Sequence, residues 1–503
     1  MSTSLTWLLD GIAPIAANDC RVDDITLHSG EARTGSVFFA LQGRTVHGLQ
    51  YAGDAVARGA TAVLWEPQAG LKVPQLPPSV CVAAIPGLSK LLGRIADRFF
   101  KWPSSYLKIT AITGTNGKTT CAYLLAQCLQ RLGFSSAYIG TLGWGRIEAL
   151  AAQTLTTPDV VTLHRRLAEL RAAGVRDVAV EVSSVALDQE RTAGVRFHTA
   201  AFTNLSRDHL DYHATMAAYG AAKARLFDAA ELRHIVINVG DAFGRAFAQR
   251  YAGRVPLTAV WIGAGDSGWL AERAMHAERV SIDLHGISLQ IEGSFGNVDV
   301  NTRLLGRFNA ENSLVVMACL SSLGVALEDA ARVLAVCLPP PGRMEVVEPV
   351  AGGKPAAGDR PMTVIDYAHT PDALAKALMA LREHCRGELW CVFGCGGDRD
   401  AGKRPLMGAV ADELADQIIV TDDNPRSENP ESIARAIVQG IKSRTPRVIH
   451  DRSDAIATAL RQARPADVVL IAGKGHEDYQ IYGATRRSFS DRREAQRYLG
   501  VAA

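Results

Sequence analysis

Short apolar runs alternate with longer segments of helical periodicity along most of the chain. In the first hundred residues, runs rich in β-branched and aromatic residues predict strands at 36–43, 60–66 and 80–86. A second series of predicted strands occupies 107–113, 177–184, 199–205 and 234–239. A third occupies 362–368, 388–394, 416–423 and 467–475 and alternates with amphipathic helical patterns. Strands that alternate with helices in this way are typical of an α/β protein.

Two segments separate the three series of strands. The stretch "KWPSSY" (101–106) has the composition of a linker, and the proline run in "CLPPPGRME" (337–345) indicates a second boundary. A chain of 503 residues is long enough for about three domains at roughly 150 residues each. We therefore expect an N-terminal domain over 1–104, a central domain over 105–337 and a C-terminal domain over 338–503.

The composition indicates which partners are not expected and in which compartment the protein is expected. The 54 basic and 52 acidic residues nearly balance, so neither nucleic acid nor an acidic membrane is predicted as a partner. The N-terminus lacks a basic signal-peptide region, and no stretch approaches the roughly 18 apolar residues of a membrane span. Nine scattered cysteines do not form a disulfide framework, and Cys391 and Cys395 lack a second pair at zinc spacing. We expect a cytoplasmic protein without membrane insertion or zinc.

A glycine-rich turn, "GTNGKTT" (114–120), lies between the predicted strand 107–113 and a helical pattern with Leu125, Cys128, Leu129 and Leu132 on one face. Backbone N–H groups of such a turn, together with a helix N-terminus, favour an anion. A lysine at 118 is suited to phosphate oxygens and a hydroxyl at 119 to Mg²⁺. The usual phosphate-loop spacing would place another glycine at position 112, where the chain has isoleucine. The pattern favours nucleotide binding over an ordinary glycine-rich turn.

The stretch "TDDNPRSE" (421–428) follows the apolar run 416–420. Its proline stiffens a turn, and Arg426 offers a planar fork that fits a carboxylate or a phosphate. Taken alone, the stretch is equally a surface turn in which Arg426 pairs with a neighbouring acid.

Nine further segments occur in an order that resembles the Mur ligase family, from about Leu27 to Asp491. They are "EVSS" (181–184), "TNLSRDHLDYH" (203–213), "AAKARLF" (221–227), "GRFNAEN" (306–312), "PGRME" (341–345), "VIDYAHTPDAL" (364–374), "FGCGGDRDAGKRPLMG" (393–408), "DDNPR" (422–426) and "AGKGHEDYQ" (472–480). Any one of these segments could arise by chance, but the whole series in this order is specific.

The resemblance implies a three-domain α/β architecture with a central, P-loop-like ATPase domain and a C-terminal Rossmann-like domain. It also implies an ATP-dependent ligase that forms an amide through an acyl phosphate. The expected partners are ATP, UDP-N-acetylmuramoyl-L-alanyl-D-glutamate and meso-2,6-diaminopimelate, with Mg²⁺ as the cofactor and a monomer as the state of the protein.

The resemblance also assigns site residues of the nucleotide and metal. ATP is expected at Gly114, Thr115, Asn116, Gly117, Lys118, Thr119, Thr120, Asn309 and Arg343, with Asp366 and His369 nearby. The metal is expected at Thr119, Glu181, His209 and Lys223, the last as a carbamate (N6-carboxylysine). Lys118, Lys223 and His209 are the expected catalytic residues. From the residues alone, Glu181 could be a surface acid, Lys223 an ordinary helical lysine, and Asn309 or Arg343 a capping or packing residue.

The remaining assignments concern the two substrates. The UDP-linked substrate is expected at Leu27, Ser29, Arg44, Thr45, Val46, Thr156, Thr157, Ser183, Gln189 and Arg191. Diaminopimelate is expected at Arg399, Asp423, Asn424, Pro425, Arg426, Gly473 and Glu477. One departure from the family pattern is Val185, which stands where a histidine commonly follows the two serines, and no role can be carried over to it.

Several alternatives stay open at the level of the sequence. A lysine-adding ligase of the same family would be expected to lack Arg426, because the side chain of lysine ends in an ammonium without a carboxylate. Folylpolyglutamate synthase shares the ATP-dependent chemistry but should lack "DNPR" and the segment 393–408. A non-catalytic ATP-binding module would bind ATP without phosphate release that depends on an amino acid.

Overall fold

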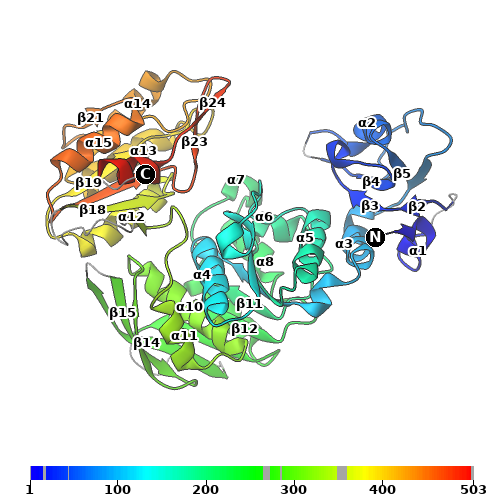
Figure 1. Cartoon of the computed structure of the whole chain (residues 1–503), viewed down its shortest axis with the longest axis horizontal. Helices are drawn as coiled ribbons and strands as arrows, with labels where there is room; N and C mark the ends of the chain where they lie inside the picture. The colour runs from blue at the N-terminus through cyan, green and yellow to red at the C-terminus, as the bar shows by residue number, and fades with distance from the viewer. Residues whose placement is uncertain are drawn as a thin grey trace. The chain divides into compact units, whose positions relative to one another are not determined.

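The computed structural model describes residues 2–14, 19–43, 45–263, 272–283, 286–347 and 360–499 (Figure 1). The chain divides into two compact units. The first unit comprises Met1–Ala259 with Trp269–Arg273, and the second comprises Val260–Gly268 with Ala274–Ala503. The division falls within β13 (Leu257–Ile262). The expected boundaries of three domains remain a prediction.

The first unit begins with a four-stranded parallel sheet in the order β3-β4-β5-β6. The elements of this region are β1 (Thr3–Ser4), α1 (Leu5–Leu9), β2 (Arg21–Val22), β3 (Asp24–Thr26), β4 (Ser36–Ala40), α2 (Ala52–Ala57), β5 (Ala60–Trp65), β6 (Cys81–Ala84) and α3 (Leu88–Phe99). Residues of α1 and α3 pack in one apolar cluster with the sheet, and residues of α2 pack in another. All three strands expected here are confirmed.

A larger, mainly parallel sheet forms the rest of the first unit, with neighbouring strands in the order β12-β11-β7-β10-β8-β9. Its strands are β7 (Lys108–Thr113), β8 (Ser136–Gly140), β9 (Gly143–Gly145), β10 (Asp177–Glu181), β11 (Thr199–Phe202) and β12 (His234–Asn238). The helices are α4 (Lys118–Arg131), α5 (Val160–Ala172), α6 (Ser184–Asp188), α7 (Leu210–His213), α8 (Met216–Ala224) and α9 (Ala242–Tyr251). The four strands expected in this region are confirmed.

Two local features differ from the sequence-based expectation. Helix α4 is buried on every side from Thr119 to Leu129, so its apolar surface is wider than the single face that the leucine spacing predicted. The expected linker 101–106 contains a short 3₁₀ helix, η3 (Pro103–Tyr106), after two residues with left-handed backbone, Lys101 (φ 60°) and Trp102 (φ 50°).

The second unit begins with antiparallel strands and two helices. Strands β14 (Arg273–Asp283), β15 (Gly286–Gly293) and β16 (Val298–Thr302) pair in sequence order, and α10 (Phe308–Ser322) and α11 (Leu327–Leu334) follow. Helix α10 carries an almost unbroken series of buried residues, because it is apolar around most of its circumference.

A six-stranded sheet in the order β17-β18-β22-β19-β20-β21 forms the C-terminal part of the second unit. Its elements are β17 (Glu345–Val346), β18 (Met362–Asp366), α12 (Pro371–His384), β19 (Leu389–Phe393), α13 (Lys403–Leu414), β20 (Gln417–Val420), α14 (Pro430–Val438), β21 (Arg447–Val448), α15 (Arg452–Gln462), β22 (Val468–Ala472) and α16 (Asp491–Tyr498). A hairpin of β23 (Tyr479–Tyr482) and β24 (Thr485–Ser488) stands apart from this sheet. The four strands expected here are confirmed.

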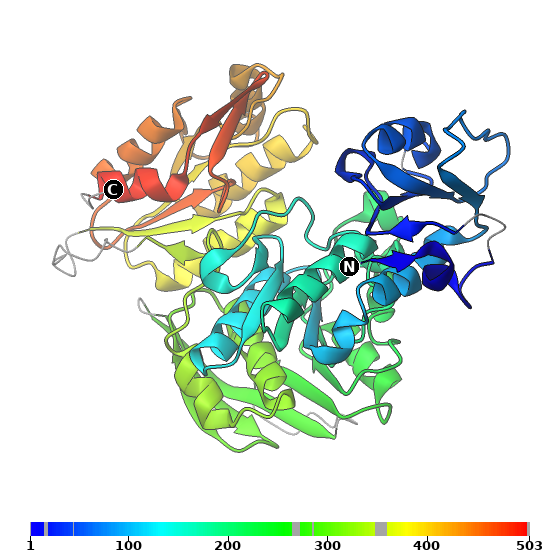
Figure 2. The same cartoon turned by 45° about the vertical axis from the view of Figure 1, so that its right-hand side comes forward.

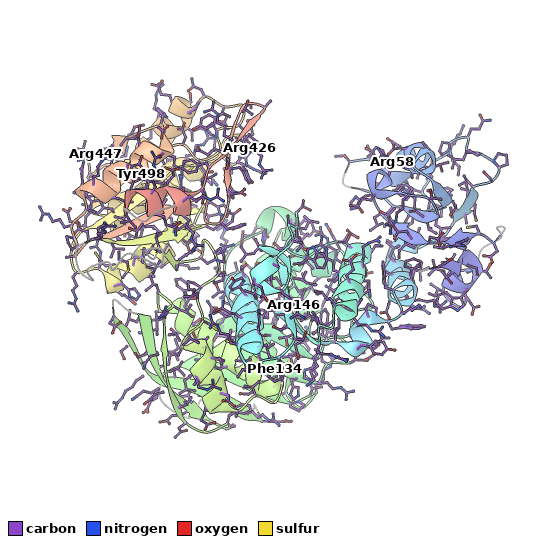
Figure 3. The ribbon with its side chains drawn as sticks, viewed as in Figure 1. Arg58, Phe134, Arg146, Arg426, Arg447 and Tyr498 are labelled. Carbon is purple, nitrogen blue, oxygen red and sulfur yellow. The ribbon has the colours of Figure 1, made fainter. Side chains whose placement is uncertain are left out.

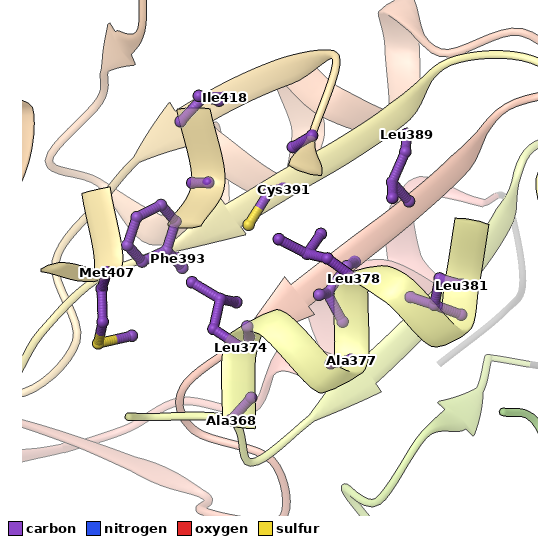
Figure 4. Packing of buried hydrophobic residues seen from close by; sticks show 14 of the residues in the cluster. Ala368, Leu374, Ala377, Leu378, Leu381, Leu389, Cys391, Phe393, Met407 and Ile418 are labelled. Atoms are coloured by element: carbon purple, nitrogen blue, oxygen red, sulfur yellow. The ribbon is translucent and has the colours of Figure 1, made fainter. Parts of the chain in front are cut away.

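Helices cover both faces of this C-terminal sheet (Figures 1 and 2). Residues of α12, α13 and α14 pack in one apolar cluster, and residues of α15 and α16 pack in the other. Figure 4 shows Leu374 and Leu378 of α12 on the side of the helix that faces Cys391 and Phe393 of β19. The sheet is parallel except for β17, which pairs antiparallel with β18. A mainly parallel sheet covered on both faces is the expected α/β arrangement, which is confirmed.

A fully buried ion pair joins α15 to the start of α16. Arg452 Nε donates to Asp491 Oδ1 at 2.7 Å, and its Nη2 donates to Asp491 Oδ2 at 2.8 Å. The same guanidinium donates to the backbone oxygens of Ala472 (2.9 Å) and Asp422 (3.5 Å). Arg452 therefore ties together the two loops that follow β20 and β22.

Two findings concern the chain as a whole. In the part of the chain that the structure describes, no helix is both long enough and apolar enough to cross a membrane. None of the nine cysteines forms a disulfide with another described residue.

We predict that Arg452→Met lowers the free energy of unfolding by about 3–5 kcal/mol, because it leaves the Asp491 carboxylate buried without its partner. The double variant Arg452→Met/Asp491→Leu should recover most of this loss, since it removes both charges. Urea unfolding measures the effect, and Arg461→Met, an exposed change on the same helix, should stay within about 0.5 kcal/mol of the parent. A single variant as stable as the parent would contradict the account.

Candidate functional site

The phosphate-loop segment leaves β7 and enters α4 through two glycines with positive φ. Gly114 has φ 153°, and a Cβ there would lie 1.9 Å from Thr203 Oγ1, so no side chain fits. Gly117 (φ 84°) precedes the first turn of α4. Lys118 Nζ donates to the backbone oxygens of Gly114 (2.9 Å) and Thr115 (2.8 Å). The loop is therefore closed on its own lysine, next to a helix N-terminus that favours anions.

The segment after β11 holds this loop in place. Thr115 N donates to Asn204 O (2.8 Å), and Asn116 N donates to Asn204 Oδ1 (3.0 Å). Thr203 Oγ1 donates to Asn116 O at 2.6 Å. The family segment 203–213 and the segment 114–120, distant in sequence, thus share one site.

Glu181 ends the strand β10 and is almost completely buried. Its carboxylate accepts from Thr119 Oγ1 (2.8 Å), from the backbone N–H of Thr141 (2.9 Å), from Thr141 Oγ1 (3.2 Å) and from the hydroxyl of Tyr138. The reading of Glu181 as a surface acid is therefore wrong. The carboxylate lies at the start of α4, in contact with one expected metal residue.

Lys223 is also buried, and its ammonium group has few neighbours that stabilise charge. Its Nζ donates to Gly114 O at 2.7 Å and lies 4.5 Å from the ring centroid of Tyr219. Burial, followed by the nearby ammonium of Lys118, lowers the pKa of Lys223 well below its usual range. Lys223 is therefore no ordinary exposed helical lysine; it lies against the phosphate loop with a strong tendency to be neutral.

His209 also lies near Tyr219, with 6.1 Å between the ring centroids. Its side chain is about half exposed, and its Nε2 lies 3.6 Å from Asp208 Oδ2. His213, which the sequence reasoning did not select, is buried instead, donates or accepts at Ser184 Oγ (2.9 Å) and stacks on Tyr219. Among the described residues, no group of three or more His, Cys, Asp or Glu side chains could hold a metal ion.

Five residues expected to bind the UDP-linked substrate gather beside Glu181. Thr157 Oγ1 donates to Glu181 O (2.9 Å) and accepts from Ser183 N (3.1 Å), and Thr156 Oγ1 lies 3.1 Å from Thr141 Oγ1. Arg191 binds Gln189 Oε1 through two nitrogens, at 3.0 and 2.6 Å. Val185 lies on α6, one residue beyond Ser184, and is partly exposed.

The other expected residues of that substrate lie around the N-terminal sheet. Leu27 follows β3, and Ser29 begins a 3₁₀ turn. Thr45 and Val46 belong to a turn that is closed by Gly43 N donating to Val46 O at 2.9 Å. The expected residue Arg44 lies outside the described residues.

Between Leu27 and Ser29, His28 links this region to α5. Its Nε2 lies 3.7 Å from Oδ2 of Asp159, the residue that caps α5 through Thr162 N (3.0 Å). Polar contact with the Asp159 carboxylate raises the pKa of His28 above 6.5, against the opposing effect of burial. Burial would raise the pKa of Asp159, but His28 and Thr162 together lower it.

In the second unit, the expected ATP residues have different surroundings. Asn309 donates from Nδ2 to Leu305 O (2.8 Å) and accepts from Asn312 Nδ2 (2.8 Å), so its side chain is used within α10 and its approach. Arg343 lies over the ring of Tyr367 at 4.7 Å, and its buried Nε has no hydrogen-bond partner in the described part of the chain. Burial raises the pKa of Asp366, which accepts from Met344 N and Ala368 N at 2.8 Å each.

Most of the residues expected to bind the amino acid meet in one place. Asn424 Nδ2 donates to Glu477 Oε2 at 2.9 Å. Gly473 (φ 111°) comes so close to Asp423 that a Cβ would lie 2.6 Å from its Oδ2. Lys474, between the two expected residues 473 and 477, is completely buried among them. We call Asp423, Asn424, Gly473, Lys474 and Glu477 the acidic pocket.

Arg426 lies next to this pocket, beside the β23–β24 hairpin (Figure 3). Its backbone has φ 53°, its N donates to Ile481 O (3.0 Å), and its Nη1 donates to Gly397 O (2.8 Å). A Cβ at Gly396 would lie 2.8 Å from Arg426 Nη1 and 3.8 Å from Arg399 Cγ. Arg399 itself is exposed. The guanidinium of Arg426 therefore has a backbone partner, and among the described residues no acid lies within ion-pair distance of it, although Asp398 is close enough to interact electrostatically.

Three functional candidates were missed by the sequence reasoning: Tyr219, Gly396 and Lys474. Tyr219 touches Thr115 Oγ1 through its hydroxyl (3.1 Å), and burial raises its pKa to about 12. A lysine flanked by glycines in "AGKGHE" was a usable signal for position 474. The close approaches of Gly396 and Tyr219 depend on residues far away in the sequence and had no local signal.

Comparison with known proteins identifies the family of the chain. Three family models match the chain in order: the Mur ligase family catalytic domain over 21–100, the Mur ligase middle domain over 112–320 and the Mur ligase glutamate ligase domain over 342–475. Together they define an ATP-dependent ligase of three-domain α/β architecture. The chain belongs to the Mur ligase family.

Curated relatives and a solved structure with the same name match the chain over nearly its whole length. The chain is 45% identical over 491 residues to the UDP-N-acetylmuramoyl-L-alanyl-D-glutamate–2,6-diaminopimelate ligase of Alkalilimnicola ehrlichii, covering 96% of each. It is 45% identical to the ligase of the same name from Ectopseudomonas mendocina, covering 98% of each. A solved structure of a ligase with this name matches with a TM-score of 0.69, 33% identity and 99% coverage of both chains.

We predict that the pKa of His28, followed by NMR titration of its ring protons, lies above 6.5 and returns toward that value in Asp159→Asn. Because the folded pKa is the higher one, the pair stabilises the fold below pH 6.5, and this contribution is lost as the pH rises through the folded pKa. An unchanged titration in Asp159→Asn would contradict the proposed link between the two residues.

Proposed function

We propose that this chain is an ATP-dependent ligase that adds meso-2,6-diaminopimelate to UDP-N-acetylmuramoyl-L-alanyl-D-glutamate in the synthesis of peptidoglycan precursors. The observation that carries the proposal is the near full-length match to ligases named for this reaction. All substrates are small and polar, so a monomeric, cytoplasmic enzyme suffices for the reaction.

The chemistry must overcome the low reactivity of a carboxylate toward an amine. Transfer of the γ-phosphoryl group of ATP to the carboxylate gives an acyl phosphate, and attack of the amine then displaces inorganic phosphate. We assign the phosphates to the loop 114–120, whose backbone N–H groups and helix N-terminus attract anions. Lys118 would exchange its two backbone acceptors for phosphate oxygens, which carry more charge and accept more strongly.

The residues near the phosphate loop fit Mg²⁺ on the condition that Lys223 is carbamylated. Mg²⁺ prefers hard oxygen ligands, and the Thr119 hydroxyl and Glu181 carboxylate supply two within 2.8 Å of each other. When bound, the ion would neutralise charge that develops between the phosphate and the carboxylate. A protonated Lys223 would add a group of the wrong sign, whereas a carbamate there adds another carboxylate-like ligand. His209, whose side chain is about half exposed, completes the proposed set.

The surroundings of Lys223 support its proposed carbamylation. A neutral amine attacks CO₂, an N–C bond forms, and one proton leaves the nitrogen to give a carbamate with a single negative charge. An ammonium group has no lone pair for this step. Burial and the nearby Lys118 lower the pKa of Lys223 and so favour the neutral amine, which supports the modification.

The UDP-linked substrate and ATP are assigned to separate groups of residues. The UDP-linked substrate is assigned to Leu27, Ser29, Arg44, Thr45, Val46, Thr156, Thr157, Ser183, Gln189 and Arg191. Arg343, with its buried and unused Nε, is assigned to ATP, for which Asn309 now has weaker support because its own side chain is satisfied internally.

Selection of the amino acid rests on the distal end of diaminopimelate, which bears an ammonium and a carboxylate. Arg426 and Arg399 would bind the carboxylate, and Glu477 with the Gly473 carbonyl would accept from the ammonium. Lysine offers no carboxylate there, so the guanidinium of Arg426 would lose a partner. This argument separates the proposed function from that of a lysine-adding ligase.

We predict that Lys223→Ala lowers turnover by about a hundredfold or more, because a group that stabilises the transferred charge is lost. A small carboxylic acid at high concentration should restore part of the activity by occupying the vacated space. After incubation with ¹³C-bicarbonate, the parent should show a carbamate ¹³C resonance that the variant lacks. The exposed change Lys90→Ala serves as the control, and a fully active Lys223→Ala would remove the carbamate from the proposal.

We predict that Arg426→Ala raises the KM for diaminopimelate and leaves that for ATP nearly unchanged. Loss of one partner of a partly desolvated charge pair costs about 2–5 kcal/mol, which is about a 30- to several-thousand-fold change. Arg426→Lys should recover little, since an ammonium cannot form two parallel hydrogen bonds.

The measurement is the amide formed from diaminopimelate and from lysine by the parent and both variants. Arg435→Ala, an exposed change on α14 whose side chain pairs with Glu431, is the matched control. A parent that prefers lysine, or an Arg426→Ala that weakens both amino acids equally, would show that Arg426 is a structural turn residue.

A further inference from the structure

The backbone around Lys474 forces its side chain inward. The residue follows β22 between Gly473 (φ 111°) and Gly475 (φ 53°), and a Cβ at Gly475 would lie 2.8 Å from Tyr367 Cβ. The side chain has no exposed surface. Lysine is almost never fully buried unless its charge is compensated, so its neighbours must account for the placement.

The acidic pocket supplies that compensation. Lys474 Nζ donates to Glu477 Oε2 and to Asn424 Oδ1, both at 3.2 Å, and lies 3.7 Å from Asp423 Oδ1. Arg452 also interacts electrostatically with these two acids, but its guanidinium is paired directly with Asp491. Lys474 therefore acts as the counter-ion of Asp423 and Glu477.

Lys474 also fixes the orientation of Asn424. The Oδ1 atom of Asn424 accepts from Ile481 N (3.0 Å) as well as from Lys474 Nζ. Two donors on Oδ1 require the Nδ2 group to face the other way, toward Glu477 Oε2. Three residues expected to bind the amino acid are thus set by one buried ammonium group.

We propose that Lys474 is a specificity-determining residue of the acidic pocket, because its ammonium cancels one of two carboxylate charges and leaves a single negative charge. This inference rests on the proposed function. A pocket with one net negative charge, next to Arg426, matches a substrate end with one ammonium and one carboxylate. Without Lys474 the pocket would carry two negative charges, which would favour an ammonium and repel a carboxylate.

The two candidate amino acids respond differently to that change. Lysine presents only an ammonium and would gain from the added negative charge. Diaminopimelate presents an ammonium and a carboxylate, so its gain at one group is opposed by repulsion at the other. A change in the ratio of kcat/KM for the two amino acids therefore reports the charge of the pocket, whereas general damage to the fold lowers both values together.

The test compares Lys474→Gln, Lys474→Met and Lys474→Arg. Gln keeps hydrogen-bond donors without the charge, Met removes both, and Arg keeps the charge. We expect the ratio of kcat/KM for diaminopimelate over lysine to fall at least about tenfold in the Gln and Met variants. The Arg variant should keep the ratio within about threefold even if its larger head lowers turnover, and the KM for ATP should change by less than about twofold in all three.

A matched control is Lys376→Met, which removes an exposed lysine of α12 that pairs with Asp372 and should leave the ratio unchanged. Thermal unfolding of each variant identifies any that fails to fold, and the Gln and Arg variants then decide the result. If the parent joins diaminopimelate but Lys474→Gln keeps the parental ratio, the inference about Lys474 is wrong and the proposed function stands. If the parent does not join diaminopimelate, the proposed function itself is wrong.

Discussion

Burial of the Glu181 carboxylate is the constraint on which the arrangement of the first unit depends. A charged group removed from water costs several kcal/mol unless hydrogen bonds replace its hydration. Here the replacement comes from Thr119 at the start of α4, from Tyr138 at β8 and from Thr141 beyond it. One carboxylate thus fixes the position of the N-terminus of α4 relative to the sheet. The glycine-rich phosphate loop must then connect β7 to α4 within the space that remains.

The same physical logic governs the end of the second unit, with the signs reversed. There the buried groups that need compensation are cations, Lys474 and Arg452. Each is surrounded by acceptors from the loops after β20 and β22, including Asn424, Asp422 and Ala472. Because a cation shared by two loops holds both, the carboxylates of the acidic pocket keep their positions without a substrate. Preorganised charges of this kind cost little further ordering when a substrate binds.

Much of the fold could be predicted from the sequence, because parallel strands that are buried on both faces appear in the sequence as short continuous apolar runs. The eleven strands expected from such runs are present in the structure. The candidate site was harder to predict from the sequence. The loop 114–120 and Arg426 had local signals, but the partners of Glu181 lie about 40 to 60 residues away. Two of the three partners of Lys474, Asp423 and Asn424, lie about 50 residues away. Contacts of this range follow from topology, which local periodicity does not determine.

The central claim is that the substrate carboxylate is activated by direct transfer of a phosphoryl group from ATP. The most direct test uses the UDP-linked dipeptide with ¹⁸O at both oxygens of its reacting carboxylate, together with ATP and diaminopimelate. If an acyl phosphate forms, its bridging oxygen comes from the carboxylate and leaves with the phosphate, so mass spectrometry should find one ¹⁸O atom in each phosphate released. Phosphate without ¹⁸O, accompanied by normal amide formation, would contradict the account.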